Sequence, residues 1–426
     1  MSTSPSPEPD GRTGPAETSG SAAQPAPPPA EPSFDPERPL PSAPDPWQPS
    51  HLPPLRPGPP YLMSEMIAAE PALARRLLAR LADPTGPAAR LAAAVRETAA
   101  ANRPIVVTGC GTSEHGALGT ADILRDALRA AGLPTFPGSP IAGQAFEISL
   151  DPPPNGLLIG ISHEGGTGAT NAALASAGAR GARTALITVG DRSPGAALAE
   201  IVVTTDEMDQ SWCHTIGYVS PLLAATAVAG HLTGTAPDPA AVADLMALGA
   251  GTTNAVEWIA ASLAGARTIV VVASGADRTA ARELALKIEE GAWLPSTMRD
   301  LETLLHGHLA ATDERTGLVL ILADRDRRAE RLARAGQALA AARVIGLRTA
   351  AIVSREVDPE LAPELTPAGR IVVDEAPGLA APVAALLGTA TALQLLTERL
   401  ARACGTNPDP IRRDDARYRE AADVAG

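Results

Sequence analysis

One short segment, ELALKIEEGAW at residues 283–293, holds the only lysine among the 35 lysine and arginine residues of the chain. Arginine can fill most surface roles of a lysine, but it cannot readily lose its proton or present a compact ammonium group. Because residues three and four apart share a helix face, Glu283, Lys287 and Glu290 should line one side of this helix. The plain alternative is a solvent-exposed salt-bridge face. Lys287 is therefore the first residue whose type calls for a chemical reason.

Two histidines follow this segment. Sixteen residues after Glu290 the chain reads LLHGH, which contains His306 and His308. A carboxylate, an ammonium and an imidazole could together open a sugar ring and move a proton between adjacent carbons. Glu290, Lys287 and His306 are therefore the candidate catalytic residues.

Two glycine-rich turns lie earlier in the chain, GCGTSEHG from residue 109 and SHEGGTGAT from residue 162. Each follows an apolar run and leads into a helical pattern, so each should lie at the carboxyl end of a parallel strand, where ligands bind. Free N–H groups and hydroxyls at a helix start suit a phosphate. The hydroxyl residues of these turns are Thr112, Ser113, Ser162 and Thr167. Neither turn matches a dinucleotide-binding fingerprint, and no cofactor is expected.

The elements that must position these residues alternate between apolar strands and helices, which predicts an α/β fold with two parallel sheets flanked by helices. Because 20 of the 42 prolines lie in the first 60 positions, the N-terminus should be a disordered tail. The expected order is a proline-rich tail at 1–58, a helical region at 59–100, a first domain at 101–235, linker helices at 236–262, a second domain at 263–405 and a C-terminal tail at 406–426.

Composition limits the possible partners. A net charge of -13 argues against nucleic acid or an anionic membrane as the main partner. The N-terminus lacks the features of a signal peptide and no apolar run approaches the ~20 residues that span a bilayer, so a cytoplasmic protein is expected. One group of side chains contains residue types that can bind zinc. Packing and pocket polarity explain these side chains more simply, so no metal is expected. That group comprises Cys110, Glu114, His115, His163, Glu164, Cys213 and His214.

The order GCGTS, ISHEGGT, ELALKIEE and HGH resembles the sugar isomerase (SIS) domain superfamily. It is most similar to the tandem-SIS isomerase half of glucosamine-6-phosphate synthase and to related isomerases and deglycases. The resemblance spans roughly residues 60 to 420 and implies two tandem SIS-type domains. It implies a phosphorylated sugar or amino sugar as ligand and a homodimer in which a histidine reaches in from a second subunit.

The resemblance also implies roles for single residues. Glu290 corresponds to the carboxylate that shuttles a proton between C1 and C2, His306 to the ring-opening histidine, and Lys287 to the active-site helix lysine. The remaining expected substrate contacts are Thr112, Ser113, Ser162, His163, Glu164, Thr167, His214 and Arg417.

Three departures from the family pattern affect the expected function. Glu164 stands where the family has a serine, and a carboxylate beside a phosphate dianion costs about 4 kcal/mol at 4 Å in an effective dielectric near 20. The C-terminal tail has Arg417 and its neighbours where the synthase has an imine-forming lysine. No glutaminase-like segment precedes the resemblance, so amide transfer from glutamine is not expected.

The preferred hypothesis is an aldose–ketose isomerase or deaminase that acts on a sugar phosphate or amino-sugar phosphate. In it, Glu290 is the base, His306 opens the ring, and Lys287 stabilises an enediolate or forms an imine. Two alternatives stay open. One is a sugar-phosphate-binding regulator without turnover. The other is a deglycase of sugar–amine adducts, in which Glu164 would meet an amine.

Overall fold

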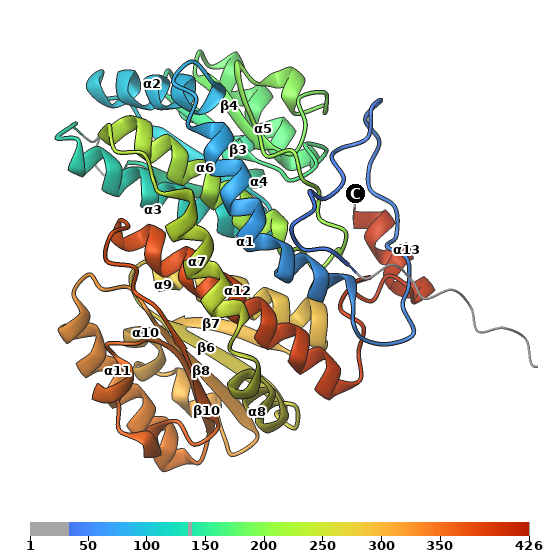
Figure 1. Ribbon diagram of the computed structural model, residues 1–426, viewed down its shortest axis with the longest axis vertical. Coiled ribbons are helices and arrows are strands. Elements are labelled where there is room, and N and C mark those ends of the chain that lie inside the picture. Colours follow the sequence, from blue (N-terminus) through green and yellow to red (C-terminus); the bar gives the residue numbers. More distant parts are fainter. Residues whose placement is uncertain (1–33, 135–138, 426) are drawn as a thin grey trace, which may run out of the picture. The chain divides into compact units, whose positions relative to one another are not determined.

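The computed structural model describes residues 34–134 and 139–425, and residues 35 onward form one compact unit (Figure 1). Most of the expected N-terminal tail, residues 1–33, lies outside the described residues. Two helices open the described unit, α1 (Leu62–Leu81) and α2 (Pro87–Ala100). They fall within the helical region that the sequence predicts.

The first α/β domain is built on a five-stranded sheet with the order β2-β1-β3-β4-β5, and all its pairings are parallel. The apolar runs IVVTG and LLIGI form β1 and β3, and every residue of both strands is buried, as helices on both faces of a sheet require. Its strands are β1 (Ile105–Gly109), β2 (Ile141–Gln144), β3 (Leu157–Ile161), β4 (Arg183–Thr188) and β5 (Ile201–Thr204). Its α-helices are α3 (Thr112–Ala130), α4 (Ala145–Leu150), α5 (Gly168–Ala179) and α6 (Ile216–Thr233).

The second domain repeats this arrangement in its own five-stranded parallel sheet, with the order β10-β9-β8-β6-β7. Before it come α7 (Pro239–Ala250) and α8 (Thr253–Leu263). Its strands are β6 (Thr268–Ala273), β7 (Ser296–Asp300), β8 (Thr316–Leu322), β9 (Arg348–Ser354) and β10 (Gly369–Val373). Its α-helices are α9 (Asp277–Lys287), α10 (Leu301–Leu305), α11 (Arg328–Ile345) and α12 (Ala381–Cys404), and α13 (Ala416–Ala425) ends the chain. The predicted α/β class with two parallel sheets is confirmed.

Numbered within its own domain, each sheet runs in the order 2-1-3-4-5. In such sheets the connections leave in opposite directions on either side of the gap between strands 1 and 3, and ligands bind at that switch point. In the first domain the gap lies between β1 and β3, which the two glycine-rich turns follow. In the second it lies between β6 and β8. The topology therefore offers two switch-point positions.

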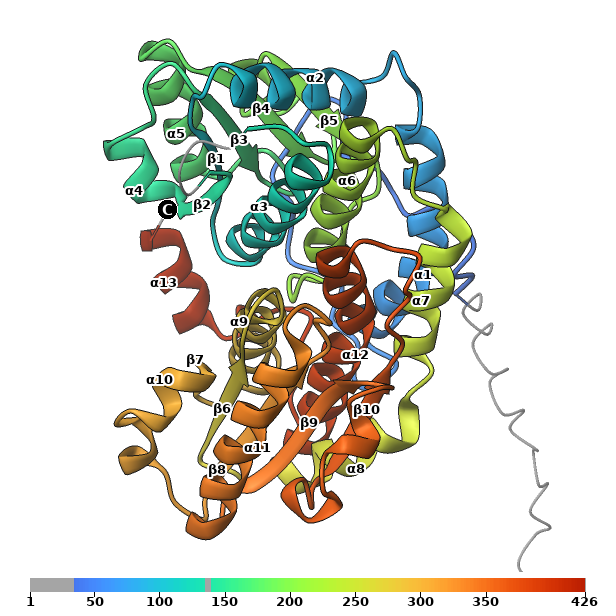
Figure 2. The same ribbon diagram turned by 90° about the vertical axis from the view of Figure 1, so that its left-hand side faces the viewer.

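The two domains meet where α9 of the second packs against α3 of the first (Figure 2). Gly119 of α3 allows a close approach, because a Cβ there would lie 2.4 Å from Cδ2 of Leu222 on α6 and 3.1 Å from Cδ1 of Leu386 on α12. Helix α9 thus lies between its own sheet and the first domain, which places its polar residues at the domain boundary.

Helix α6 is buried in this packing. Among the described helices it alone has the length and mean hydropathy that could cross a bilayer, and 83% of that window is buried inside the structure. An apolar core helix passes the same test, and burial on nearly all sides is the feature expected of one.

The N-terminal segment differs from its expected description as a tail from residue 1 to 58. Residues 35–58 hydrogen-bond to the first domain: the N–H of Leu40 donates to Glu207, and the N–H of Met208 donates to the carbonyl of Pro41. Proline richness led to the expectation of disorder. An extended proline-rich segment can nevertheless be ordered where its few N–H and C=O groups find partners on a folded surface.

Candidate functional site

A cavity of about 490 Å³ lies at the first switch point. It is bounded by the loops that follow β1 and β3, by the π-helical turn Ile288–Ala292 that continues α9, and by segments from both ends of the described chain. Its lining residues are Trp47, Pro49, Ser50, Cys110, Gly111, Thr112, Ser113, His163, Glu164, Gly166, Thr167, Gly168, Trp212, His214, Glu290, Ile411 and Arg413. Both α3 and α5 begin at this cavity, and the first turn of α5 can present N–H groups to a ligand. In the first turn of α3 the N–H groups of Ser113 and Glu114 instead donate to the carbonyls of Cys110 and Gly111.

Glu290 brings a carboxylate to this cavity from the second domain. Its Oε2 lies 2.5 Å from Nζ of Lys287, and 22% of its side chain is exposed. Burial raises the pKa of Glu290 above its ordinary value, although the Lys287 ammonium opposes that rise. Glu290 is therefore a carboxyl group that faces a cavity and has a raised pKa. Such a group is suited to accept and return a proton.

Lys287 lies behind Glu290, and none of its side chain is exposed. Burial alone would lower its pKa, but the carboxylates of Glu290 and Glu283 raise it above its ordinary value, so the group is a permanent ammonium. Glu283 lies 3.6 Å from Nζ on the other side. The predicted shared face of these three residues is therefore present, but it faces protein instead of solvent.

Glu283 links the two domains. His115 Nδ1 on α3 lies 2.7 Å from its Oε2, and the hydroxyl of Thr112 donates to its Oε1 at 3.3 Å. Burial opposes the ionisation of Glu283, but Lys287 and the hydrogen bond with His115 lower its pKa below its ordinary value. The ammonium is thus shared between Glu290, which is its nearer partner, and Glu283. Of these two carboxyl groups only Glu290 lines the cavity and has a raised pKa, so it is the one suited to change its protonation state.

Two imidazoles lie on another wall of the cavity, with the ring centroids of His163 and His214 5.2 Å apart. The backbone N–H of Asp209 donates to Nε2 of His163 at 2.9 Å, which requires that nitrogen to be unprotonated. Burial lowers the pKa of His163 to about 4, and burial also lowers the pKa of His214. Both rings are therefore neutral near pH 7 and cannot serve as cations for an anionic ligand.

The structure brings seven of the predicted site residues to this one cavity: Thr112, Ser113, His163, Glu164, Thr167, His214 and Glu290. Two others lie behind its wall. The hydroxyl of Ser162 is buried and donates to Oγ1 of Thr167, and Lys287 reaches the cavity only through Glu290.

His306 and Arg417 do not line the cavity within one chain. His306 directly follows α10; its Nε2 lies 2.6 Å from Oε1 of Glu302, and 70% of its side chain is exposed. Arg417 pairs with Asp415 at 2.7 Å and 81% of its side chain is exposed. The guanidinium that reaches the cavity from the C-terminal segment is instead Arg413, which lies over the ring of Trp212 at 5.1 Å.

Sequence reasoning missed the contribution of residues 47–50. Trp47 and Ser50 lie in a proline-rich stretch, and only the rarity of tryptophan, four in the whole chain, pointed to them. It also missed how Arg413 is placed. The carboxylate of Asp409 accepts the N–H groups of Leu62 and Met63 at 2.9 Å each, which fixes the C-terminal segment beside the cavity.

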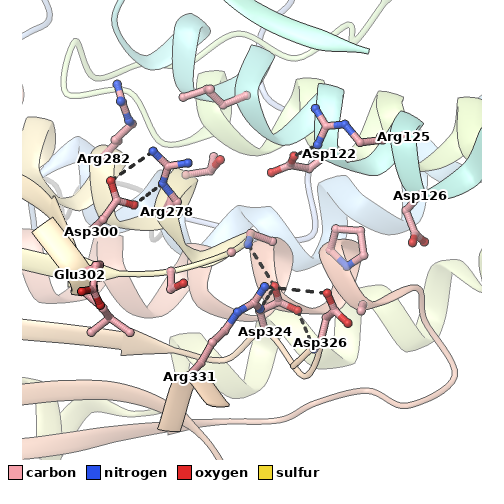
Figure 3. Close-up of a pocket in the computed structure, with 18 of the residues that line it drawn as sticks. Asp122, Arg125, Asp126, Arg278, Arg282, Asp300, Glu302, Asp324, Asp326 and Arg331 are labelled. Carbon is pink, nitrogen blue, oxygen red and sulfur yellow. Dashed lines mark hydrogen bonds and ion pairs between the residues drawn. The ribbon is translucent and has the colours of Figure 1, made fainter. Parts of the chain in front are cut away.

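A larger cavity, about 740 Å³, lies at the second switch point and is lined mainly by charged side chains (Figure 3). These charges are largely paired with one another: Arg278 with Asp300 at 2.5 Å and Arg331 with Asp324 at 2.5 Å. Oδ2 of Asp324 also accepts the N–H of Ala276 beside the start of α9, where an anionic ligand would otherwise bind. The first switch point is therefore the better candidate for a ligand site.

Within residues 34–134 and 139–425, no group of three or more His, Cys, Asp or Glu side chains is arranged to hold a metal ion.

Comparison with known families matches residues 262–399 to the SIS domain. Residues 262–399 form a SIS domain. The SIS match falls on β6 to α12, and both sheets of the chain share one strand order.

The chain is homologous to glutamine–fructose-6-phosphate aminotransferase (isomerizing) of Gloeobacter violaceus. The two are 30% identical over 279 residues, which cover 61% of this chain and 44% of that protein. The chain thus spans less than half the length of this curated relative.

Two solved structures share the tandem SIS fold. The C-terminal domain of glucosamine-fructose-6-phosphate aminotransferase from Francisella tularensis superposes with a TM-score of 0.67 at 18% identity, over 84% of this chain and 99% of that one. Tagatose-6-phosphate ketose/aldose isomerase from Escherichia coli superposes with a TM-score of 0.64 at 18% identity, over 82% and 95%. These likenesses establish the fold.

Proposed function

We propose that this SIS-domain protein interconverts the aldose and ketose forms of a sugar phosphate, or removes an amine from an amino-sugar phosphate, in the cavity at the first switch point. The observation that carries the proposal is Glu290, a carboxyl group with a raised pKa that faces this cavity and is held by a buried ammonium. Homologues named for fructose 6-phosphate and tagatose 6-phosphate support a phosphosugar ligand.

In this mechanism Glu290 removes the proton beside the open-chain carbonyl and returns it to the neighbouring carbon. Lys287 acts through Glu290, because its ammonium is buried and permanently charged, whereas an imine-forming lysine must be neutral and reachable. The hydroxyls of Ser113 and Thr167 and the start of α5 can donate hydrogen bonds to substrate oxygens, whereas the hydroxyl of Thr112 already donates to Glu283.

Ring opening requires a second acid–base group. We assign it to His306 of a second subunit, because within one chain this imidazole is exposed and paired with Glu302 instead of lining the cavity. This assignment implies a homodimer whose two-fold axis brings each His306 to the other chain's cavity.

The test is exchange of substrate hydrogen with heavy water. The chain is incubated with glucose 6-phosphate, fructose 6-phosphate and glucosamine 6-phosphate, and deuterium at C1 and C2 is followed by NMR. We expect exchange with at least one of them and a fall of about 100- to 10,000-fold in the Glu290→Gln variant, with binding retained. No exchange with any of the three, or full exchange in Glu290→Gln, would contradict the proposal.

One alternative has an observation in its favour. A sugar-binding regulator without turnover is favoured by His306, which lies outside the cavity of its own chain. It predicts an increased melting temperature with sugar phosphates and no product. Detection of a product would exclude it.

A further inference from the structure

Glu164, in the loop between β3 and α5, is held at the cavity by the N-terminal segment. The backbone N–H of Ser50 donates to Oε2 of Glu164 at 2.9 Å, and the indole N–H of Trp47 donates to its carbonyl oxygen at 2.8 Å. The indole N–H of Trp212 donates to the hydroxyl of Ser50 at 3.1 Å and fixes the donor segment in turn. The carboxylate therefore has a defined position in the lining instead of turning away to solvent.

The packing of this segment on the loop is specific. A Cβ on Gly166 would lie 2.7 Å from Cζ2 of Trp47, so the indole rests where any side chain at 166 would have to be. The loop and residues 47–50 fit together only because position 166 is glycine. The N-terminal segment is thus a structural part of the ligand site.

The charges that face the cavity disfavour an anion at this loop. Its lining holds two carboxylates, Glu164 and Glu290, and one guanidinium, Arg413. No carboxylate in the described part of the chain forms an ion pair with Arg413, which stacks on Trp212. The nearby imidazoles of His163 and His214 are neutral near pH 7, as their lowered pKa values require. Arg413 is therefore the cation in this lining that can bind an anionic group of a ligand, whereas the carboxylate of Glu164 would repel such a group.

A carboxylate accepts hydrogen bonds and donates none. Oε2 of Glu164 already accepts the Ser50 N–H, whereas Oε1 accepts no hydrogen bond from the described residues. A hydroxyl or an ammonium can donate to this carboxylate, whereas a phosphate would meet it as a like charge.

We propose that Glu164, positioned by Trp47 and Ser50, determines specificity in this cavity: it selects a ligand that presents a hydroxyl or an ammonium group at the loop between β3 and α5, and leaves any anionic group of that ligand to Arg413. The inference rests on the proposed function only in placing the ligand in this cavity. It concerns which end of the ligand is recognised and is independent of turnover.

The test uses three probes that differ at one position: glucose, glucose 6-phosphate and 6-amino-6-deoxyglucose. Their dissociation constants are measured by calorimetry for the full chain and for Glu164→Ser, Glu164→Gln and the control Glu289→Gln. Glu289 lies in the turn that bounds the cavity, but its side chain is exposed, accepts the N–H of Ser296 and is not part of the lining. Its variant therefore removes the same charge without changing a lining side chain.

In Glu164→Ser we expect glucose 6-phosphate to gain at least about tenfold in affinity relative to glucose, because one negative charge beside the ligand is removed. Glu289→Gln should leave the ratio unchanged. Glu164→Gln separates the two sources of the donor: loss of a preference for the amino sugar identifies an ammonium, and equal weakening of glucose and the amino sugar identifies a hydroxyl.

An unchanged ratio of glucose 6-phosphate to glucose between the full chain and Glu164→Ser would overturn the inference. So would the absence of binding of all three probes to every variant. Binding with the expected selectivity but without hydrogen exchange would remove only the proposed isomerase activity and leave this inference standing.

Discussion

The ammonium of Lys287 lies 2.5 Å from Oε2 of Glu290 and 3.6 Å from Oε1 of Glu283, with none of its side chain exposed. This position explains why the one lysine of the chain is not an arginine. A compact ammonium on a flexible stem fits between two carboxylates, whereas a planar guanidinium needs more room and a different geometry. The group holds its charge permanently and thereby keeps Glu290 in place.

Replacing Lys287 by methionine should destabilise the fold by about 3–5 kcal/mol, because it leaves Glu283 and Glu290 without their buried counter-charge. Urea unfolding of the two proteins measures the difference. The double variant Lys287→Met/Glu283→Gln should recover part of the loss, since one unpaired charge is then removed. Equal stability of Lys287→Met and the unchanged chain would contradict the buried ion-pair description.

If His306 acts in the partner's cavity, Glu290→Gln and His306→Asn chains should complement each other. Each variant alone should be inactive, but after unfolding and refolding of an equal mixture, about a quarter of full activity should return, because half of the dimers are mixed and each mixed dimer has one complete site. Activity is read from hydrogen exchange with heavy water. A mixture as inactive as its components would contradict the action of His306 in the partner's cavity.

Acid should destabilise the protein through His163. Burial lowers the pKa of His163 from 6.5 to about 4, so between these values the unfolded chain takes up a proton that the folded chain does not. The contribution of neutral His163 to the free energy of unfolding is fully present above pH 6.5 and is lost as the pH falls through 4. A His163→Asn variant keeps the neighbouring titratable groups Glu164, Asp209 and His214, so a comparison with it isolates the effect of His163.

The free energy of unfolding of the His163→Asn variant should therefore fall less on acidification, by about 3 kcal/mol between pH 6.5 and 4. Denaturant titrations at a series of pH values give both curves. Parallel curves for the two proteins would mean that His163 titrates normally in the folded state.

Asp409 should couple stability to ligand binding. Its carboxylate accepts the first N–H groups of α1 from Leu62 and Met63, and its carbonyl accepts the N–H of Trp212. Asp409→Ala should cost about 1–2 kcal/mol by loss of this cap and should weaken sugar binding by displacing Arg413. Asp409→Asn, which keeps one acceptor oxygen, should lose less of both. Thermal unfolding with and without ligand measures the two effects.

Two glycine-to-alanine substitutions in helices should have opposite signs. Gly119→Ala places a Cβ 2.4 Å from Leu222 and should destabilise by about 1–3 kcal/mol through overpacking. Gly336→Ala lies within α11, where nothing stands within 4 Å of the added Cβ, and should stabilise by about 0.5–1 kcal/mol. The free energies of unfolding of both variants are measured by urea unfolding. If both substitutions changed this free energy in the same direction, the helix packing described for α3 would be contradicted.

Local patterns were sufficient to predict the elements and part of the site. Apolar runs of five to seven residues followed by glycine turns identify buried parallel strands, and the turns then fall at the carboxyl edge, where Thr112, Ser113 and Thr167 line the cavity. The spacing of Glu283, Lys287 and Glu290 predicts their shared helix face for the same reason. Each of these inferences depends on neighbours within one or two turns of the chain.

What the sequence alone determined is therefore the α/β class, the two sheets, the hydroxyl-bearing turns and the ion-pair helix, because backbone periodicity encodes which residues share a face. Only the tertiary structure decided that Lys287 is buried behind Glu290, that Arg413 reaches the cavity in place of Arg417, and that Trp47 and Ser50 complete it. These outcomes depend on which distant segment covers a given face. Packing and the pairing of backbone groups decide which segment covers which face, as where Asp409 accepts the N–H groups of Leu62 and Met63. Such long-range contacts cannot be predicted from a local sequence pattern.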